Sequence, residues 1–186
     1  MNENKYVKAF LAPRIGRGIY GIGLAIVCIV TAVPRAYSVQ ELAVFMRSGI
    51  APGSLMPMYI GSILCALGFS YLIYKRLMDI GKLQEIRKKI AGCYAGIYLL
   101  ACVIQFYSYQ KIINVGLSIA NRSTSERVYE QMMMIIKDAK SDIDFCSYII
   151  IILFVIAIAG IFIKGTDGEN DNGEKPITLK ELRGKW

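Results

Sequence analysis

The sequence has no histidine among its 186 residues. The chain therefore lacks the commonest metal ligand and the usual general base of enzymes. It also lacks a P-loop, a GxSxG motif, an HExxH motif and a paired-carboxylate arrangement that could act as acid and base. We expect no enzymatic activity, no catalytic residue, no cofactor and no metal site.

Its five cysteines do not form a CxxC pair, and no two of them share a loop. A disulfide framework or a zinc site would need such pairs. All five lie inside or at the edge of apolar stretches: Cys28, Cys65, Cys93, Cys102 and Cys146. Buried cysteine behaves as a small hydrophobic side chain, so we predict a packing role for them.

Charged residues are missing from four long stretches, at residues 18–34, 48–74, 90–110 and 145–163. A helix rises about 1.5 Å per residue, so each stretch nearly or fully crosses a hydrocarbon layer about 30 Å thick. We predict an all-α membrane protein, a bundle of four transmembrane helices with spans at about 18–36, 57–74, 90–110 and 145–163. The bundle is expected to form a single domain over residues 1–176, followed by a short cytoplasmic tail at 177–186.

Basic residues are distributed unevenly around these spans. About two thirds of the 22 Lys and Arg residues lie before the first span, between the second and third, or after the fourth. Basic residues in short loops are retained in the cytoplasm, so we expect both termini to be cytoplasmic. The net charge of +8 is expected to face anionic phospholipid rather than nucleic acid, because the basic residues lie beside helix ends.

The third loop is expected to contain a helix of its own. Ser123 and Glu126 have the spacing of a capping box. Apolar residues then follow at helical spacing: Val128, Met132, Ile135, Ala139 and Ile143. We predict an external amphipathic helix of about five turns that runs into the fourth span. Its methionines at 132–134 either form an adaptable binding surface or lie on the bundle or the outer leaflet.

A charged cluster occupies residues 75–82. Arg76 and Asp79 are one helical turn apart and can pair, while Gly81 can take the left-handed conformation that ends a helix. We predict that Asp79 also pairs with one of the two arginines before the first span, which leaves a basic rim for phospholipid phosphate or a protein partner. The basic rim consists of Arg14, Arg17, Arg76, Asp79 and Lys82. The alternative is a helix end with solvated charges, since exposed ion pairs are weak.

Small residues indicate where helices can approach closely. Gly92 and Gly96 form a GxxxG motif at the start of the third span. We expect these glycines to pack against another helix of the same bundle, or alternatively to form a homodimer interface.

Three short segments carry a family resemblance: Arg14, Ile15, Arg17 and Tyr20; Arg76, Leu77, Asp79, Ile80, Gly81 and Lys82; Gly165, Thr166, Gly168, Asn170, Gly173 and Pro176. They resemble, in this order, the motifs G-R-I-S-R-x-x-Y/F-W, R-R-L-H-D-I-G-K/R-S-G-W-W and G-T-x-G-x-N-x-Y/F-G-x-D/N-P of the domain of unknown function 805 family. Gly21, Met78 and residues 83–86 depart from these motifs, so the chain resembles a divergent member. The resemblance implies a multi-helix protein of the bacterial inner membrane, and it implies no established activity.

The third of these segments, the tail turn motif at 165–176, is rich in glycine and polar residues. We expect it to turn back over the basic rim, with Asp167, Glu169 and Asp171 facing the arginines. Its spacing does not fit a calcium-binding EF-hand.

Two functional classes remain open. The first is a non-enzymatic integral membrane protein that binds anionic phospholipid, a membrane-protein partner or a second copy of itself. The second is a small oligomeric pore or transporter subunit with a polar path along Ser62, Ser70 and Gln105. Coupled transporters usually carry charged residues inside their spans, so the first class is favoured.

Overall fold

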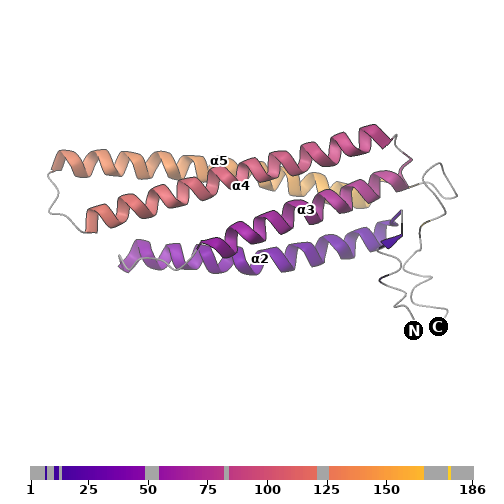
Figure 1. Cartoon of the computed structure of the whole chain (residues 1–186), viewed down its shortest axis with the longest axis horizontal. Helices are drawn as coiled ribbons and strands as arrows, with labels where there is room; N and C mark the ends of the chain where they lie inside the picture. Colours follow the sequence, from indigo (N-terminus) through magenta and orange to yellow (C-terminus); the bar gives the residue numbers. More distant parts are fainter. Residues whose placement is uncertain are drawn as a thin grey trace. The chain divides into compact units, whose positions relative to one another are not determined.

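The computed structural model describes residues 14–48, 55–81, 84–120 and 126–165, together with 7, 11, 12 and 176. These residues form four long helices and no strand, and Figure 1 labels them along the chain. The helices are α2 (Arg17–Ser48), α3 (Met56–Asp79), α4 (Gln84–Ala120) and α5 (Glu126–Phe162). Each is long and apolar enough to cross a membrane. The predicted all-α fold with four candidate spans is confirmed at this level.

All four helices are longer than their predicted spans, and α3, with 24 residues, exceeds its span the least. α2 has 32 residues, whereas α4 and α5 have 37 each. At about 1.5 Å per residue they measure roughly 48 to 56 Å, well over a hydrocarbon thickness of about 30 Å. α2 extends beyond the predicted span of about 18–36, through Pro34 and Arg35 to Ser48. The span itself stays a prediction. Proline is tolerated inside membrane helices because neighbouring groups can satisfy the freed carbonyl.

The long α5 confirms a continuous helix from the third loop into the fourth span. It begins at Glu126 and runs without interruption to Phe162, while Ser123 of the capping box lies outside the described residues. Ala139, on the predicted apolar face, is fully buried. Met133 and Met134 are exposed.

Packing divides the chain into two compact units. Unit 1 comprises residues 1–29, 65–96 and 153–186, and unit 2 comprises 30–64 and 97–152. Every helix contributes to both units, so neither is a separate stretch of chain. Unit 1 contains the first turns of α2 and α4 and the last turns of α3 and α5, whereas unit 2 contains the other end of each helix. The expectation of one domain over 1–176 stays a prediction.

Aromatic and small residues fill the core of unit 1. The Phe69 ring lies edge-on to the rings of Tyr94 and Phe154, with centroids 6.2 and 6.0 Å away. Such edge-to-face pairs stabilise a core beyond the area that they bury. Gly68 allows α3 to approach Val27 of α2, because a Cβ at this position would lie 2.8 Å from Val27 Cγ2.

Unit 2 has a core of its own. Phe45, Leu55 and Ile113 are buried at its centre. Partly buried side chains pack around them: Leu42, Phe106, Tyr109 and Leu117. Gly116 lies against the ring of Phe45, where a Cβ would come within 2.7 Å of Cζ. The second half of α2 is therefore held by packing against α4.

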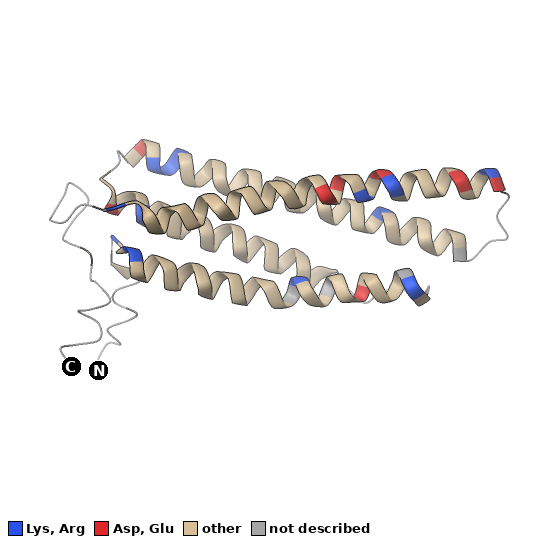
Figure 2. Ribbon diagram, turned by 180° about the vertical axis from the view of Figure 1, so that it is seen from behind, with Lys and Arg blue, Asp and Glu red and all other residues tan. Residues whose placement is uncertain are grey.

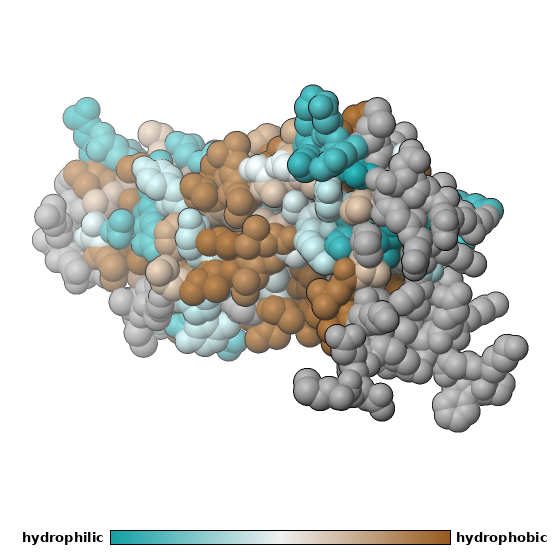
Figure 3. Space-filling view, turned by 45° about the vertical axis from the view of Figure 1, so that its right-hand side comes forward, coloured by the Kyte–Doolittle hydropathy of each residue, from teal (hydrophilic) through white to brown (hydrophobic). Residues whose placement is uncertain are grey.

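Large apolar side chains also lie on the outer surface of the helices. Examples that are more than half exposed are Ile29, Val33, Leu100, Ile152 and Phe162. Figure 3 shows brown apolar side chains over much of the described surface. Such extended apolar surface is unusual for a protein in water and suits contact with lipid.

Candidate functional site

Three segments of unit 1 that are distant in sequence meet at one buried carboxylate. Asp79 ends α3, and its Oδ1 lies 3.1 Å from Nη2 of Arg14, which precedes α2. Its Oδ2 accepts a hydrogen bond from Nη1 of Arg76, one turn earlier on α3. The relative exposures of Arg14, Arg76 and Asp79 are 1%, 2% and 2%. The predicted pairings of Asp79 with Arg76 and with an arginine before the first span are confirmed, and we call these three residues the Arg–Asp–Arg cluster.

Arg76 connects this cluster to the end of α5. Its Nε donates to the carbonyl oxygen of Gly160 at 3.0 Å, and its Nη2 donates to the carbonyl oxygen of Ile163. Its Nη1 also lies 3.4 Å from the carbonyl oxygen of Ile15. The planar guanidinium of arginine has five donors in a fixed fork, which suits contact with a carboxylate and several carbonyls together. The side chain thereby satisfies carbonyl groups that the end of a helix leaves without intrahelical partners.

The termination of α3 positions Asp79. The amide of Ile80 donates to Arg76 O at 3.2 Å, and the amide of Gly81 donates to Met78 O at 3.2 Å. Gly81 has a φ of 80°, a left-handed conformation that favours glycine. The predicted helix stop at Gly81 is confirmed, and it leaves Asp79 on the final turn, facing Arg14.

The beginning of the tail turn motif covers the cluster. Gly165 lies so close to Asp79 that a Cβ there would overlap the carboxylate. Pro176, at the other end of the motif, is buried. The intervening Thr166, Gly168, Asn170 and Gly173 lie outside the described residues, as do Asp167, Glu169, Asp171 and the tail at 177–186.

Tyr20 of the first motif also contacts α5. Its hydroxyl donates to the carbonyl oxygen of Ala157 at 2.7 Å, and the side chain is buried. A Cβ on Gly160 would lie 3.0 Å from that hydroxyl, so the absence of a side chain at Gly160 lets the ring approach. Residues from all three motif segments are thus found in unit 1.

Burial changes the interpretation of the basic rim. The alternative prediction, a helix end with solvated charges, is wrong for Arg14, Arg76 and Asp79, because all three side chains are buried. Arg17 is exposed, and Lys82 lies outside the described residues. A ligand could reach the buried members only if the segments over them moved.

Unit 1 also contains exposed and partly exposed cations outside the cluster. Lys88 and Lys89, in the second turn of α4, are exposed. Lys75 donates to the carbonyl oxygen of Ala12 at 2.8 Å, and its Nζ lies 5.4 Å from the centre of the Tyr71 ring. Figure 2 shows blue basic residues on these helix ends. Such positions suit phosphate groups at a membrane surface.

The two glycines of the GxxxG motif do not pack against another helix among the described residues. No atom lies within 4 Å of a Cβ built on Gly92 or on Gly96. The prediction that these two glycines pack against another helix of the same bundle is therefore wrong. The homodimer interface stays a prediction.

Unit 2 contains a polar network of which the sequence indicated only one member, Gln105. Arg35 Nη2 donates to Gln105 Oε1 at 2.7 Å, and Gln105 Nε2 donates to Ser147 Oγ at 2.8 Å and to Ile143 O at 3.2 Å. Gln105 stood out as a polar residue inside a span. Arg35 did not, because the first helix was expected to end beside it.

No family model matches this chain, and no curated protein or solved structure matches it either. The resemblance to the domain of unknown function 805 family therefore stays a prediction.

Proposed function

We propose that this chain is a multi-pass protein of the bacterial inner membrane that binds anionic phospholipid at its cytoplasmic end, without enzymatic activity. Four membrane crossings would place both termini on the same side. The Arg–Asp–Arg cluster would hold the cytoplasmic ends of the helices together. Exposed cations around it would bind the headgroups.

The observation that carries this proposal is the charge difference between the two units. Among the described residues, unit 1 has eight basic and two acidic residues, whereas unit 2 has six of each. The basic residues of unit 1 are Arg14, Arg17, Lys75, Arg76, Arg87, Lys88, Lys89 and Lys164, and its acids are Asp79 and Glu85. The more basic side of a membrane protein is retained in the cytoplasm, so unit 1 is the cytoplasmic side.

The charge of unit 1 is also accessible to lipid. Arg17, Lys88, Lys89 and Lys164 are all exposed. A basic residue near an anionic leaflet contributes about 1 kcal/mol of attraction. Several such residues at one membrane surface are enough to enrich anionic lipid around the protein.

Native mass spectrometry tests this function. The full chain is released from bilayer nanodiscs that contain equal amounts of phosphatidylglycerol and phosphatidylcholine, and the retained lipids are counted. We expect phosphatidylglycerol to be retained in preference. The triple variant Arg17→Gln/Lys88→Gln/Lys89→Gln should lose that preference.

The matched control removes three exposed basic residues from unit 2, as Arg127→Gln/Lys137→Gln/Lys140→Gln. This variant should keep the preference for phosphatidylglycerol. Equal retention of both lipids by the unaltered protein would contradict the proposal, and so would equal loss in the two triple variants.

The Arg35–Gln105–Ser147 network supports a second candidate, the small pore or transporter subunit. Arg35 lies inside a candidate span, and ionisable residues there often mark a path for ions or solutes. Arg35 is, however, about 27 Å along α2 from Arg17, close to a full hydrocarbon thickness. If Arg17 lies at one surface, Arg35 lies near the other and can act as an anchor there. Solute flux into proteoliposomes that is abolished by Gln105→Leu would favour the pore.

A further inference from the structure

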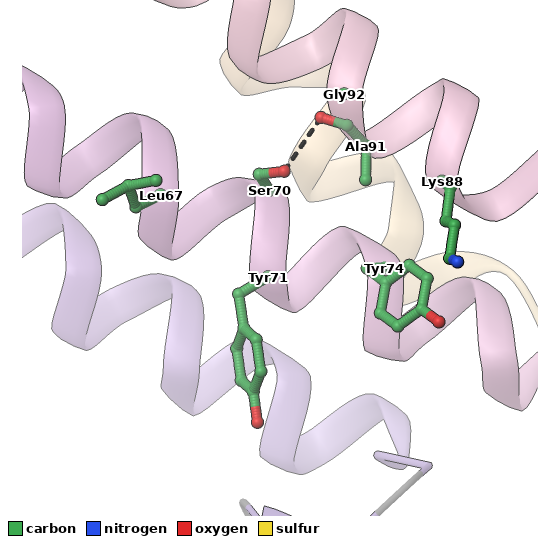
Figure 4. Close-up of a pocket in the computed structure, with 7 residues that line it drawn as sticks. All are labelled: Leu67, Ser70, Tyr71, Tyr74, Lys88, Ala91 and Gly92. Atoms are coloured by element: carbon green, nitrogen blue, oxygen red, sulfur yellow. Dashed lines mark hydrogen bonds between the residues drawn. The ribbon is translucent and has the colours of Figure 1, made fainter.

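A groove lies between α3 and α4 in unit 1, with a volume of about 370 Å³. Seven residues line it: Leu67, Ser70, Tyr71 and Tyr74 from α3, and Lys88, Ala91 and Gly92 from α4. Figure 4 shows Lys88 and Tyr74 at one end and Leu67 at the other. Its volume falls in the range of roughly 300–1,000 Å³ that is usual for small-molecule sites. We call it the α3–α4 groove.

Small residues create this groove. The Ser70 hydroxyl donates to the carbonyl oxygen of Ala91 at 2.9 Å, a bond that joins α3 and α4 (Figure 4). Above this contact Gly92 has no side chain, and the space that a Cβ would enter is open. Because the Ser70 hydroxyl is already engaged as a donor, the groove offers an apolar occupant few polar groups to displace.

Polarity changes along the groove. Leu67 is 59% exposed and presents an apolar surface at one end. At the other end Lys88 is exposed, and the Arg87 guanidinium lies 5.8 Å from the centre of the Tyr74 ring. The Lys75 ammonium lies over Tyr71 in the same way. An occupant that complements this distribution has an apolar chain and an anionic head.

We propose that the α3–α4 groove binds one anionic phospholipid, with an acyl chain along Leu67, Ala91 and Gly92 and the phosphate on Lys88. This inference rests on the proposed function and names the site at which it occurs. An acyl chain that leaves the bilayer for the groove exchanges one apolar environment for another and gains little. Preference for an anionic lipid comes from net headgroup charge at Lys88, because the phosphate of phosphatidylcholine is offset by its own choline cation. The groove determines whether a chain fits.

A second copy of the chain is the competing occupant, since Gly92 and Gly96 could form a helix-pair interface. Charge disfavours that pairing. It would bring Lys88 and Lys89 of one copy close to the same lysines of the other, and like charges across an interface are repulsive. The same two lysines attract phosphate.

The test titrates the full chain in detergent with phosphatidylglycerol and with phosphatidylcholine, and it reads lipid adducts and subunit number by native mass spectrometry. Gly92→Leu would fill the groove, and it should weaken phosphatidylglycerol binding at least about tenfold by steric exclusion. Its control is Gly96→Leu, one turn along α4, where the space is equally open but the residue does not line the groove. Gly96→Leu should bind phosphatidylglycerol like the unaltered protein.

A second pair of variants tests the headgroup contact. Lys88→Gln should weaken phosphatidylglycerol binding about fivefold and leave phosphatidylcholine binding unchanged. Lys89→Gln removes a neighbouring exposed lysine that does not line the groove, and it should have a smaller effect. Both pairs of variants compare residues on the same helix with the same change of side chain.

Three results would overturn the inference. If Gly92→Leu and Gly96→Leu both convert a dimer into a monomer, the glycines form an interface between copies. If the unaltered protein prefers phosphatidylglycerol and neither Gly92→Leu nor Lys88→Gln changes its affinity, the site lies elsewhere and the proposed function stands. If the unaltered protein binds both lipids equally, the proposed function fails and the groove assignment fails with it.

Discussion

Asp79 lies in a site that water barely reaches, between two guanidinium groups. Burying a charge is costly unless it is paired and hydrogen-bonded, so each member of the Arg–Asp–Arg cluster depends on the others. The cluster therefore has a structural role. It joins the segment before α2, the end of α3 and the end of α5. Its arginines are buried and contribute almost nothing to the exposed surface.

The first residue-scale prediction concerns removal of the central charge. Asp79→Asn preserves the shape of the side chain but leaves two buried guanidinium groups without their carboxylate. We expect the free energy of unfolding in detergent to fall by about 3–5 kcal/mol, the usual effect of breaking a buried pair. Denaturant titration measures it, and Glu85→Gln is the control at an exposed acid, with an expected change within about 0.5 kcal/mol. Equal effects of the two substitutions would show that the Asp79 pairings contribute little.

The second residue-scale prediction compares two glycines. Gly165→Ala should destabilise the protein by about 1–3 kcal/mol, because the new methyl group overlaps the Asp79 carboxylate and something must shift. Gly96→Ala should instead stabilise it by up to about 1 kcal/mol, since its Cβ enters open space and alanine favours the helix. Thermal unfolding in detergent would show melting temperatures that move in opposite directions. Movement in the same direction would contradict the proximity of Gly165 and Asp79.

Helix pairs account for stability at the scale of elements. In unit 1, α2 approaches α3 where Gly68 lies against Val27, and α3 is joined to α4 by the Ser70–Ala91 hydrogen bond. In unit 2, α2 approaches α4 where Gly116 lies against Phe45. Each close approach requires a small residue on one helix, as is common among membrane helices.

A double-mutant cycle tests the contact between α2 and α3. Gly68→Ala should destabilise the protein by about 1–3 kcal/mol, because its methyl group clashes with the branched Val27 side chain. Val27→Ala shortens that side chain and should recover part of the loss in the double variant. The free energies of unfolding of the four proteins measure this coupling. Additive effects would contradict the packing of Gly68 against Val27.

The apolar stretches predicted the number of helices but not their ends. An uncharged interval marks the part of a helix that suits hydrocarbon, whereas backbone hydrogen bonding continues for as long as packing supports it. α2 therefore passes Arg35 and ends only at Ser48, after Phe45 has packed against α4. α4 likewise extends past both ends of its uncharged interval, and α5 begins several turns before its own, at Glu126.

The Arg–Asp–Arg cluster was predictable in part, since Arg76 and Asp79 are one turn apart and Gly81 indicates the helix end. The tail turn motif was expected to turn back over the rim, but the burial of the cluster itself was not predicted. That burial depends on the end of α5, where Ile163 accepts from Arg76 and Gly165 lies against Asp79. The α3–α4 groove was also not evident, because it follows from one hydrogen bond between Ser70 and Ala91. The sequence placed Gly92 in a packing motif, whereas the structure leaves open space beside it.

At the scale of the whole molecule, the main feature is the unequal charge of the two units. The formal charge of the described part of unit 1 is strongly positive, while the acids and bases of unit 2 balance. In a bilayer this difference would fix the orientation and concentrate anionic lipid on one side. At about 1.5 Å per residue, α2, α4 and α5 are each longer than a hydrocarbon layer of about 30 Å.

The most direct test of this account is the side of the membrane on which each unit lies. Lys89→Cys in unit 1 and Glu126→Cys in unit 2 are made separately in a chain whose five native cysteines are replaced by alanine. A membrane-impermeant maleimide is then applied to intact spheroplasts and to lysed membranes. We predict that Glu126→Cys is labelled in both, whereas Lys89→Cys is labelled only after lysis. Labelling of Lys89→Cys in intact spheroplasts, with Glu126→Cys protected, would contradict the cytoplasmic placement of unit 1 and the lipid binding proposed there.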